Sequence, residues 1–336
     1  MLFREILDFY QINDFKNQII NYEEFYRNSL SEKLPAKDFI QENLDKGFYI
    51  GEEKCHLGEF LSYSAIPRYI KRKYPESKIT VCPNIFSEAV FRHNPYVDQI
   101  AFLPERKPTG AWREFGFGNQ SQRRLRAFSI YEKLPVKPEI HVSKIENEKA
   151  LHWRESLKLS GRKLMLVHSS GKTVGKIMKK KDWKSLFKSL ENEYCFVQIG
   201  SPKDQKIPAE YQQLRFFDLE NLAAMFCIAD GFLGPNSGLM HVAAATNLPS
   251  IILHNEASPA EFYLPVLADN LVLPGKANHH LWHVYPWHYH LVLTKLTDKS
   301  PFMSHYSRNN LTEMINNLKT YPENPLWKPL EKHFLD

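Results

Sequence analysis

Short apolar runs alternate with longer amphipathic segments through the second half of the chain. The runs have the length of buried strands, and the segments between them repeat apolar residues at helical spacing. This pattern predicts strands at 163–168, 195–199, 232–233 and 250–253, and helices at 182–190, 221–228 and 239–246. Strands that alternate with helices favour a parallel sheet covered on both faces.

The first half of the chain shows the same alternation less clearly. It predicts strands at 47–51, 79–83 and 100–103, and a helix that follows the first strand and ends near Lys73. Residues 1–45 show apolar positions near helical spacing, which predicts an amphipathic helical extension packed against the rest of the protein. The alternative is a face that docks a partner or a membrane.

Length and composition place the chain among ordinary globular proteins. It has 336 residues, enough for two domains, with 43% hydrophobic and 24% charged residues. No apolar run approaches the roughly 20 residues that span a bilayer. Its four cysteines are far apart and form no CxxC pair, so we expect a reducing, cytoplasmic setting.

The candidate chemistry centres on the run Ser237-Gly238-Leu239-Met240-His241 after the apolar stretch 231–234. Asn236 or Ser237 is suited to cap the helix that begins there, and Gly238 lets a ligand approach the backbone closely. The free N–H groups and the dipole of a helix start attract an anion, most often phosphate. The local pattern predicts a phosphate-bearing ligand, with His241 in the first turn near the anion.

The same run resembles a family signature. Residues 236–245, followed by Pro249 and Ser258-Pro259, are similar to the signature of the ADP-heptose:lipopolysaccharide heptosyltransferases, glycosyltransferase family 9. Further segments extend the resemblance over about 47–320: Leu57-Gly58-Glu59, Asn94-Pro95-Tyr96-Val97-Asp98, Lys137-Pro138-Glu139-Ile140, Gly200-Ser201-Pro202-Lys203-Asp204 and Asp218-Leu219-Glu220-Asn221-Leu222.

This resemblance implies an α/β fold of the GT-B type, two Rossmann-like domains facing across a cleft. The implied organisation is a helical extension (1–45), an acceptor domain (46–145), a nucleotide-sugar domain (160–300) and a C-terminal helix and tail (301–336). The interval 104–131 is rich in Gly, Arg and Gln where the family has further strands, so we expect a shortened acceptor domain.

The resemblance also implies a catalytic base. Glu59 takes the place of the family's catalytic Asp, and would remove the proton of the acceptor hydroxyl in an inverting transfer. The alternative is a surface glutamate in the first turn of a helix, where the dipole favours it.

The implied donor site draws on several segments. After strand 163–168, Ser169 or Ser170 and a lysine would meet the phosphates. Lys176 is preferred, Lys181 is its rival, and an ordinary solvated lysine run is the alternative. Glu220 would bind the ribose, or be an ordinary first-turn glutamate. Asn236, Ser237, Gly238, Leu239 and His241 would surround the diphosphate of ADP-heptose. No metal is expected, because lysine charge neutralises the leaving diphosphate.

The net charge of +6 agrees with an anionic partner. Arg123 and Arg124 are weaker candidates for binding an anionic glycolipid acceptor, the lipopolysaccharide inner core, at the inner membrane surface. No nucleic-acid module is recognised. The histidines at 279, 280, 283, 288 and 290 are interleaved with aromatic residues rather than with Cys or acids, which favours an aromatic-lined loop over a zinc site.

Two alternatives stay open. The segment 254–259 and the short acceptor domain depart from the family, which suits a GT-B transferase with another nucleotide sugar or a protein acceptor. Glu59 and Asn236 each replace a family Asp, which suits a nucleotide-sugar-binding relative without catalysis.

Overall fold

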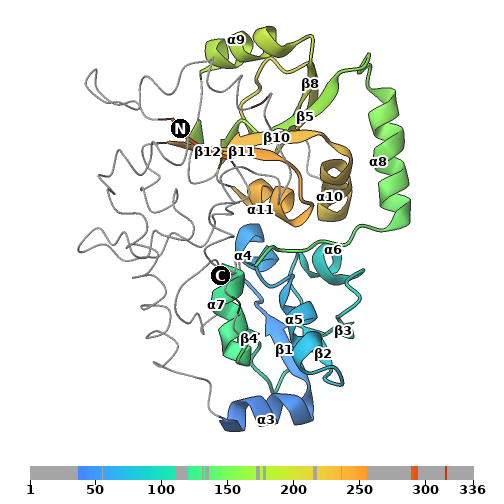
Figure 1. Cartoon of the computed structure of the whole chain (residues 1–336), viewed down its shortest axis with the longest axis vertical. Helices are drawn as coiled ribbons and strands as arrows, with labels where there is room; N and C mark the ends of the chain where they lie inside the picture. The colour runs from blue at the N-terminus through green and yellow to red at the C-terminus, as the bar shows by residue number, and fades with distance from the viewer. Residues whose placement is uncertain are drawn as a thin grey trace, which may run out of the picture. The chain divides into compact units, whose positions relative to one another are not determined.

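Two parallel sheets organise the chain, and each belongs to its own unit. The structure is a computed structural model, shown in Figure 1. It describes residues 37–54, 56–110, 120–130, 132, 136–171, 175–176, 179–214, 218–235, 237–255, 289–293 and 315. The N-terminal unit contains the described residues up to His141, and the C-terminal unit contains those from Val142 onward. Residues 1–36, 256–288 and most of the predicted helix near 309–319 lie outside the described part of the chain.

The sheet of the N-terminal unit has the order β3-β2-β1-β4, with all described pairings parallel. Its strands are β1 (Phe48–Gly51), β2 (Ile79–Val81), β3 (Gln99–Ile100) and β4 (Thr109–Gly110). Its helices are α3 (Lys37–Lys46), α4 (Leu57–Leu61), α5 (Ile66–Lys73), α6 (Ser87–Phe91) and α7 (Gln120–Leu125), followed by a 3₁₀ turn at Arg126–Phe128.

Two predictions for this unit need correction. The single helix expected to end near Lys73 is two helices, because Ser62 and Ser64 bond back to the carbonyls of Glu59 and Leu61 and tighten the chain between α4 and α5. The interval 104–131 was expected to lack strands. It supplies β4, which pairs with β1, and the helix α7.

The sheet of the C-terminal unit has the order β12-β11-β10-β5-β8-β9, also parallel throughout its described pairings. Its strands are β5 (Lys163–Val167), β8 (Tyr194–Gly200), β9 (Tyr211–Leu214), β10 (Gly231–Pro235), β11 (Ser250–Asn255) and β12 (Tyr289–Leu293). Its helices are α8 (Lys144–Ser156), α9 (Lys180–Leu190), α10 (Leu219–Ile228) and α11 (Gly238–Ala245).

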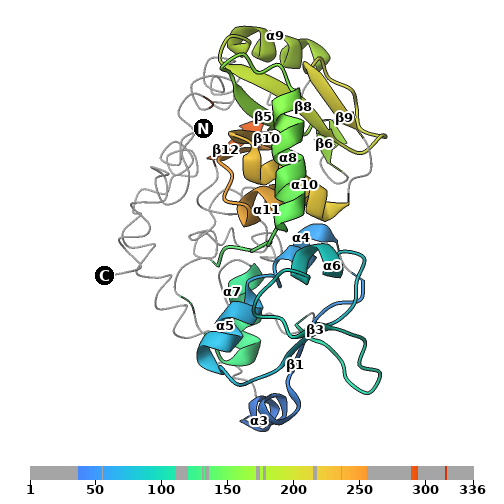
Figure 2. The ribbon, with the colours of Figure 1, turned by 90° about the vertical axis from the view of Figure 1, so that its right-hand side faces the viewer.

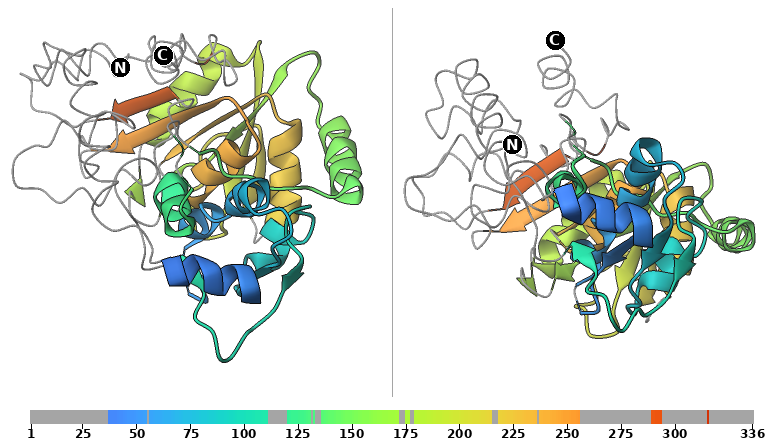
Figure 3. Two further views of the ribbon diagram at one scale, coloured as in Figure 1. Left: turned by 60° about the horizontal axis from the view of Figure 1, so that its bottom comes forward. Right: turned by 90° about the horizontal axis from the view of Figure 1, so that it is seen from below.

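The sequence pattern predicted most of this unit. The structure confirms the predicted strands and helices between 163 and 253 to within a few residues. It adds α8, β9 and β12, and the antiparallel hairpin of β6 (Ser170–Gly171) with β7 (Gly175–Lys176). Because β12 includes His290, this part of the histidine-rich segment is a strand beside β11 and not the predicted loop (Figure 3).

Helices cover both faces of this sheet. Helix α9 lies on one face, and α10 and α11 lie on the other (Figure 1). Helix α8 packs along α10 (Figure 2). Burial on both faces explains why the central strands read as continuous apolar runs rather than as alternating patterns.

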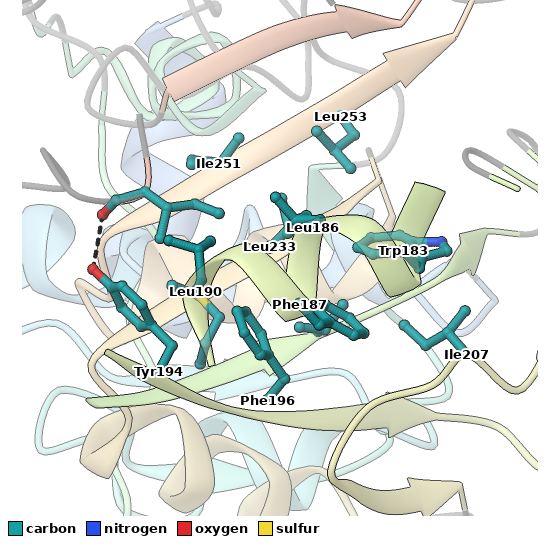
Figure 4. Packing of buried hydrophobic residues seen from close by; sticks show 13 residues of the cluster. Trp183, Leu186, Phe187, Leu190, Tyr194, Phe196, Ile207, Leu233, Ile251 and Leu253 are labelled. Atoms are coloured by element: carbon teal, nitrogen blue, oxygen red, sulfur yellow. Dashed lines mark hydrogen bonds between the residues drawn. The ribbon is translucent and has the colours of Figure 1, made fainter. Parts of the chain in front are cut away.

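The face under α9 carries a large hydrophobic cluster. The indole of Trp183 and the Phe187 ring point from α9 onto the sheet (Figure 4), and the Phe187 ring stacks on Phe196 with centroids 4.3 Å apart. The Tyr194 hydroxyl donates to the carbonyl of Ile315 at 3.0 Å, which is the dashed line in Figure 4. This bond joins Ile315, far along the chain, to the cluster. The cluster fixes the strands whose ends form the site described below.

The cluster yields a stability prediction. Leu233 is fully buried on the central strand β10. We expect Leu233→Ala to lower the free energy of unfolding by about 2–5 kcal/mol, through lost transfer energy and the cavity left behind. The matched control is Leu151→Ala on α8, where 44% of the residue is exposed, and the change should stay within about 0.5 kcal/mol. Chemical denaturation measures both, and equal losses would contradict the assignment of the core.

Candidate functional site

The ends of three strands in the C-terminal unit bring polar residues to one edge of the sheet. His168 directly follows β5, Asp204 follows β8, and Ser237 follows β10. The chain runs from β5 outward through β8 and β9, then returns to β10 on the other side of β5. The boundary between β5 and β10 is therefore a topological switch point, where open α/β sheets bind ligands outside the carboxyl ends of their strands.

Hydrogen bonds join these residues across the switch point. His168 Nδ1 lies 3.3 Å from Ser237 Oγ, and His168 Nε2 lies 3.2 Å from Asp204 Oδ2. The same Asp204 oxygen accepts the Ser201 N–H at 2.7 Å, and Ser170 Oγ donates to Asp204 Oδ1 at 3.1 Å. The result is a connected network of short polar side chains at the edge of the sheet.

The electrostatics of the network favour an ionised Asp204. Burial raises the pKa of this carboxyl, but the hydrogen bonds from His168, the Ser201 amide and Ser170 outweigh burial and leave the pKa below its ordinary value. Asp204 therefore acts as a hydrogen-bond acceptor at neutral pH.

Two glycines make room for the network. Gly200 has a φ of +143°, and a Cβ there would lie 2.2 Å from Asp204 Oδ2 and 3.1 Å from His168 Cδ2. A Cβ on Gly234 would lie 3.0 Å from the Cβ of His168 and 2.6 Å from the Phe232 ring. A side chain at 200 would displace the Asp204 carboxylate and crowd the imidazole, and one at 234 would crowd the Phe232 ring and the Cβ of His168, so glycine at both positions preserves this geometry.

Sequence reasoning singled out Ser237 and the turn that contains Gly200 and Asp204, but it assigned no role to His168. The available signal was a histidine that ends a buried strand, at the edge where parallel-sheet proteins bind ligands.

The start of α11 lies within the same edge. Ser237 occupies the N-cap position, yet its side chain makes no capping hydrogen bond, so the predicted cap by Ser237 is wrong. The hydroxyl is instead turned to His168. Gly238 and Leu239 begin the helix, and His241 is buried in its first turn with 3% exposed. Asn236 lies outside the described residues.

The two serine candidates differ in what their hydroxyls do. Ser169 is buried with 3% exposed, donates to the Gln205 carbonyl at 2.8 Å and accepts from Gln198 at 3.0 Å. Ser170 is partly exposed and bonds to Asp204. This geometry favours Ser170 over Ser169 for ligand contact.

Glu220 lies in the first turn of α10, whose N-cap Asp218 accepts the Asn221 N–H at 2.9 Å. The helix start follows β9, so by topology it belongs to the carboxyl edge of the sheet. Both interpretations of Glu220, ribose contact and first-turn glutamate, agree with this position.

The two lysine candidates occupy different elements. Lys176 lies in β7, opposite Ser170 in the hairpin, so its backbone is beside the polar edge. Lys181 is exposed in the first turn of α9. The position of Lys176 favours it over Lys181 as the residue nearer the network.

Glu59 is placed by the N-terminal unit. It lies in α4, after β1, and the strand order puts the switch point of this sheet between β1 and β4. Its Oε2 accepts the His56 N–H at 2.8 Å, the side chain–backbone half of a capping box. The first-turn interpretation is therefore realised in the structure, and the carboxylate is held at the mouth of the strand.

Arg124 packs behind this turn. It is 2% exposed, its guanidinium lies 3.7 Å from the centroid of the Tyr63 ring, and Nη1 donates to the Glu59 carbonyl at 2.6 Å and to Ser62 Oγ. Burial of this side chain favours support of α4 over the predicted contact with an acceptor. Arg123 lies in α7, with its side chain outside the described part of the structure.

Within the described residues, no group of three or more His, Cys, Asp or Glu side chains is arranged to hold a metal ion. In the same part of the chain, no helix is long and apolar enough to cross a membrane.

Comparisons with known proteins point to one family of glycosyltransferases. The model of glycosyltransferase family 9 (heptosyltransferase) matches residues 119–280. In a search of curated protein sequences, nothing matches the chain.

Solved structures match both units. ADP-heptose LPS heptosyltransferase II from E. coli matches with a TM-score of 0.54 at 15% identity, over 84% of this chain and 99% of that chain. A family 9 glycosyltransferase from Veillonella parvula DSM 2008 matches with a TM-score of 0.55 at 13% identity, over 87% and 98%. The iron-containing heptosyltransferase TibC from E. coli H10407, solved with ADP-D-β-D-heptose, matches with a TM-score of 0.47 at 10% identity, over 62% and 57%.

The family match spans the last part of the N-terminal unit, from residue 119, and much of the C-terminal unit. The two parallel sheets have the GT-B fold of the heptosyltransferases. Over residues 119–280 the chain matches glycosyltransferase family 9, the heptosyltransferase family, and its fold is similar to that of a solved heptosyltransferase.

Proposed function

We propose that this protein transfers a heptosyl group from ADP-heptose to an anionic glycolipid, the inner core of lipopolysaccharide. The observation that carries the proposal is the polar edge at the switch point of the C-terminal sheet, built from the segments that resemble the family's donor site. The donor is proposed from the family match and from the name of the E. coli relative.

In this proposal the diphosphate lies at the start of α11. Backbone N–H groups of the first turn face it, and the helix dipole adds to the attraction. Lys176 neutralises the charge that grows on the leaving diphosphate, so the proposal uses no metal ion.

Glu59 acts as the general base. The acceptor oxygen bonds to the anomeric carbon while the bond from that carbon to the diphosphate oxygen breaks. The bonding electrons leave with ADP, and the acceptor proton passes to the Glu59 carboxylate. Attack from the face opposite the diphosphate inverts the anomeric centre.

The proposal also covers the acceptor substrate and the cellular location of the protein. A lipopolysaccharide precursor is an anionic glycolipid, and the net charge of +6 favours its membrane surface. We therefore place the protein in the cytoplasm, peripherally at the inner membrane, with no role for nucleic acid.

The base assignment is tested with Glu59→Gln. Glutamine keeps an oxygen that accepts the His56 N–H, so α4 keeps its capping box and the loss is chemical. We expect turnover to fall on the order of 10²–10⁴-fold while donor affinity stays unchanged. A transferase assay with ADP-heptose and a lipopolysaccharide inner-core acceptor measures the first, and calorimetry the second.

The matched control for this test is Glu53→Gln, an exposed glutamate on the loop before α4. It should leave turnover within about twofold of the unmodified protein, since exposed substitutions away from a site have small effects. Loss of turnover in Glu53→Gln but not in Glu59→Gln would move the base to Glu53.

The donor assignment is tested by calorimetric binding of ADP, UDP and GDP. We expect ADP to bind most tightly and Lys176→Ala to weaken ADP about tenfold or more, because a hydrogen bond to a charged group is lost. Lys181→Ala is the matched control, and its exposed position predicts little change.

Other results of the binding test would favour one of the alternative functions or exchange the roles of the two lysines. Preference for UDP or GDP would keep the fold and change the donor. A larger effect of Lys181→Ala would exchange the two lysines. Binding of ADP-heptose with neither transfer nor hydrolysis, on any acceptor offered, would show a nucleotide-sugar-binding relative and contradict the transferase proposal.

A further inference from the structure

The hydroxyl of Ser237 points away from the position that its place in the chain predicts. An N-cap serine normally accepts a hydrogen bond from an amide of the first helical turn. Ser237 has the extended backbone of an N-cap residue, with φ −149° and ψ 175°, but its side chain makes no such bond. Its Oγ lies 3.3 Å from His168 Nδ1 instead.

The direction of this hydrogen bond follows from Asp204. Its Oδ2 receives the Ser201 N–H, and its Oδ1 receives the Ser170 hydroxyl. These donors and the lowered pKa keep the carboxyl ionised, so it can only accept. The contact of 3.2 Å with His168 Nε2 therefore requires the proton on Nε2.

A neutral imidazole carries one ring proton. If that proton is on Nε2 and the ring is neutral, Nδ1 is an acceptor and the Ser237 hydroxyl donates to it. The hydroxyl proton is then donated to His168 Nδ1. Ser237 Oγ can therefore only accept a hydrogen bond from a ligand. A charged imidazolium would instead donate from Nδ1 to Ser237 Oγ, so the neutral ring is part of the inference and is tested with it.

We propose that Asp204 and His168 are positioning residues that fix the Ser237 hydroxyl as a hydrogen-bond acceptor, and that Ser237 receives a hydroxyl of the ligand rather than touching its phosphate. The ligand group is a sugar-type hydroxyl, from the ribose or from the transferred sugar. The ligand part of this inference rests on the proposed function, whereas the direction of the hydrogen bond does not.

The packing around His168 maintains this orientation. A Cβ on Gly200 would lie 3.1 Å from Cδ2 of the His168 ring, and a Cβ on Gly234 would lie 3.0 Å from the Cβ of His168. The residue is 7% exposed, so the ring has little space in which to turn over. An ionised phosphate oxygen has no proton to donate, so it cannot form a hydrogen bond to the lone pairs of Ser237 Oγ. A hydroxyl of the ligand can donate such a bond.

The first experiment measures the tautomer directly. ¹⁵N NMR of histidine-labelled protein at neutral pH, with and without Ser237→Ala, identifies the His168 signal by its change. We expect a proton on Nε2 in the unmodified protein, and an Nδ1 shift that moves toward that of an unbonded acceptor nitrogen in Ser237→Ala. A proton on Nδ1, or no imidazole signal that responds to Ser237→Ala, would overturn the proposed orientation.

The second experiment measures binding of inorganic pyrophosphate, ADP and ADP-heptose by calorimetry. In Ser237→Ala we expect unchanged affinity for pyrophosphate and about three- to tenfold weaker binding of the ligand whose hydroxyl is held. If the binding of ADP and of ADP-heptose weakens alike, Ser237 binds a ribose hydroxyl. If only the binding of ADP-heptose weakens, Ser237 binds a hydroxyl of the transferred sugar.

Two variants serve as controls. Ser237→Thr keeps the hydroxyl and should restore the affinity. Ser156→Ala on α8 is the matched control and should change none of the three.

Two results would overturn the ligand assignment. Pyrophosphate that weakens as much as ADP-heptose would place the phosphate on Ser237, and no change for any ligand would remove Ser237 from the site. Failure of all three to bind the unmodified protein would contradict the proposed function and the ligand part of this inference together, while the NMR spectrum still tests the hydrogen-bond direction.

Discussion

The site depends on the parallel pairing of β5 with β8 on one side and with β10 on the other. The register Leu166↔Val197 and Phe232↔Leu166 brings the three strands to the same edge. His168, Asp204 and Ser237 follow these strands, although they lie up to 69 residues apart in the chain. Because side chains alternate between the faces of a sheet, a slip of one residue would turn the edge residues away from each other and bury polar groups in the core.

The same strand pairing requires the polar residues at the sheet edge to be hydrogen-bonded. The central strands are buried on both faces, so the polar network stands directly above a hydrophobic interior. Polar groups at such a boundary are tolerated when they are hydrogen-bonded, and the connections among His168, Asp204, Ser170 and Ser237 meet this need. The space around His168 and Asp204 is so limited that positions 200 and 234 have no room for a side chain and are glycines.

Much of the fold follows from sequence pattern, and the reason is physical. Strands buried on both faces require uninterrupted apolar runs, which made β5, β8, β10 and β11 predictable. The short elements β4, β6, β7 and β9 are two to four residues long and carry no such run, so their positions depend on pairing partners that are distant in sequence. The break between α4 and α5 depends on serine hydroxyls that bond back to the backbone, a choice that periodicity does not reveal.

The candidate site was predictable only in part. The start of α11 carries a recognisable run of residues, and so does the turn that ends in Asp204. His168 could not be assigned a role, because its partners come from two other strand ends. The sequence made Arg124 a candidate for acceptor binding, and only the fold shows that it is buried against Tyr63 and the α4 turn.

The central claim is that the switch point between β5 and β10 receives the diphosphate and a hydroxyl of a nucleotide sugar. The most direct measurement is a crystal structure of the protein with ADP-heptose. We predict phosphate oxygens within hydrogen-bond distance of the backbone N–H groups at the start of α11, and a ribose or heptose hydroxyl within hydrogen-bond distance of Ser237 Oγ. A diphosphate bound away from this edge, or a phosphate oxygen in direct contact with Ser237 Oγ, would contradict this claim.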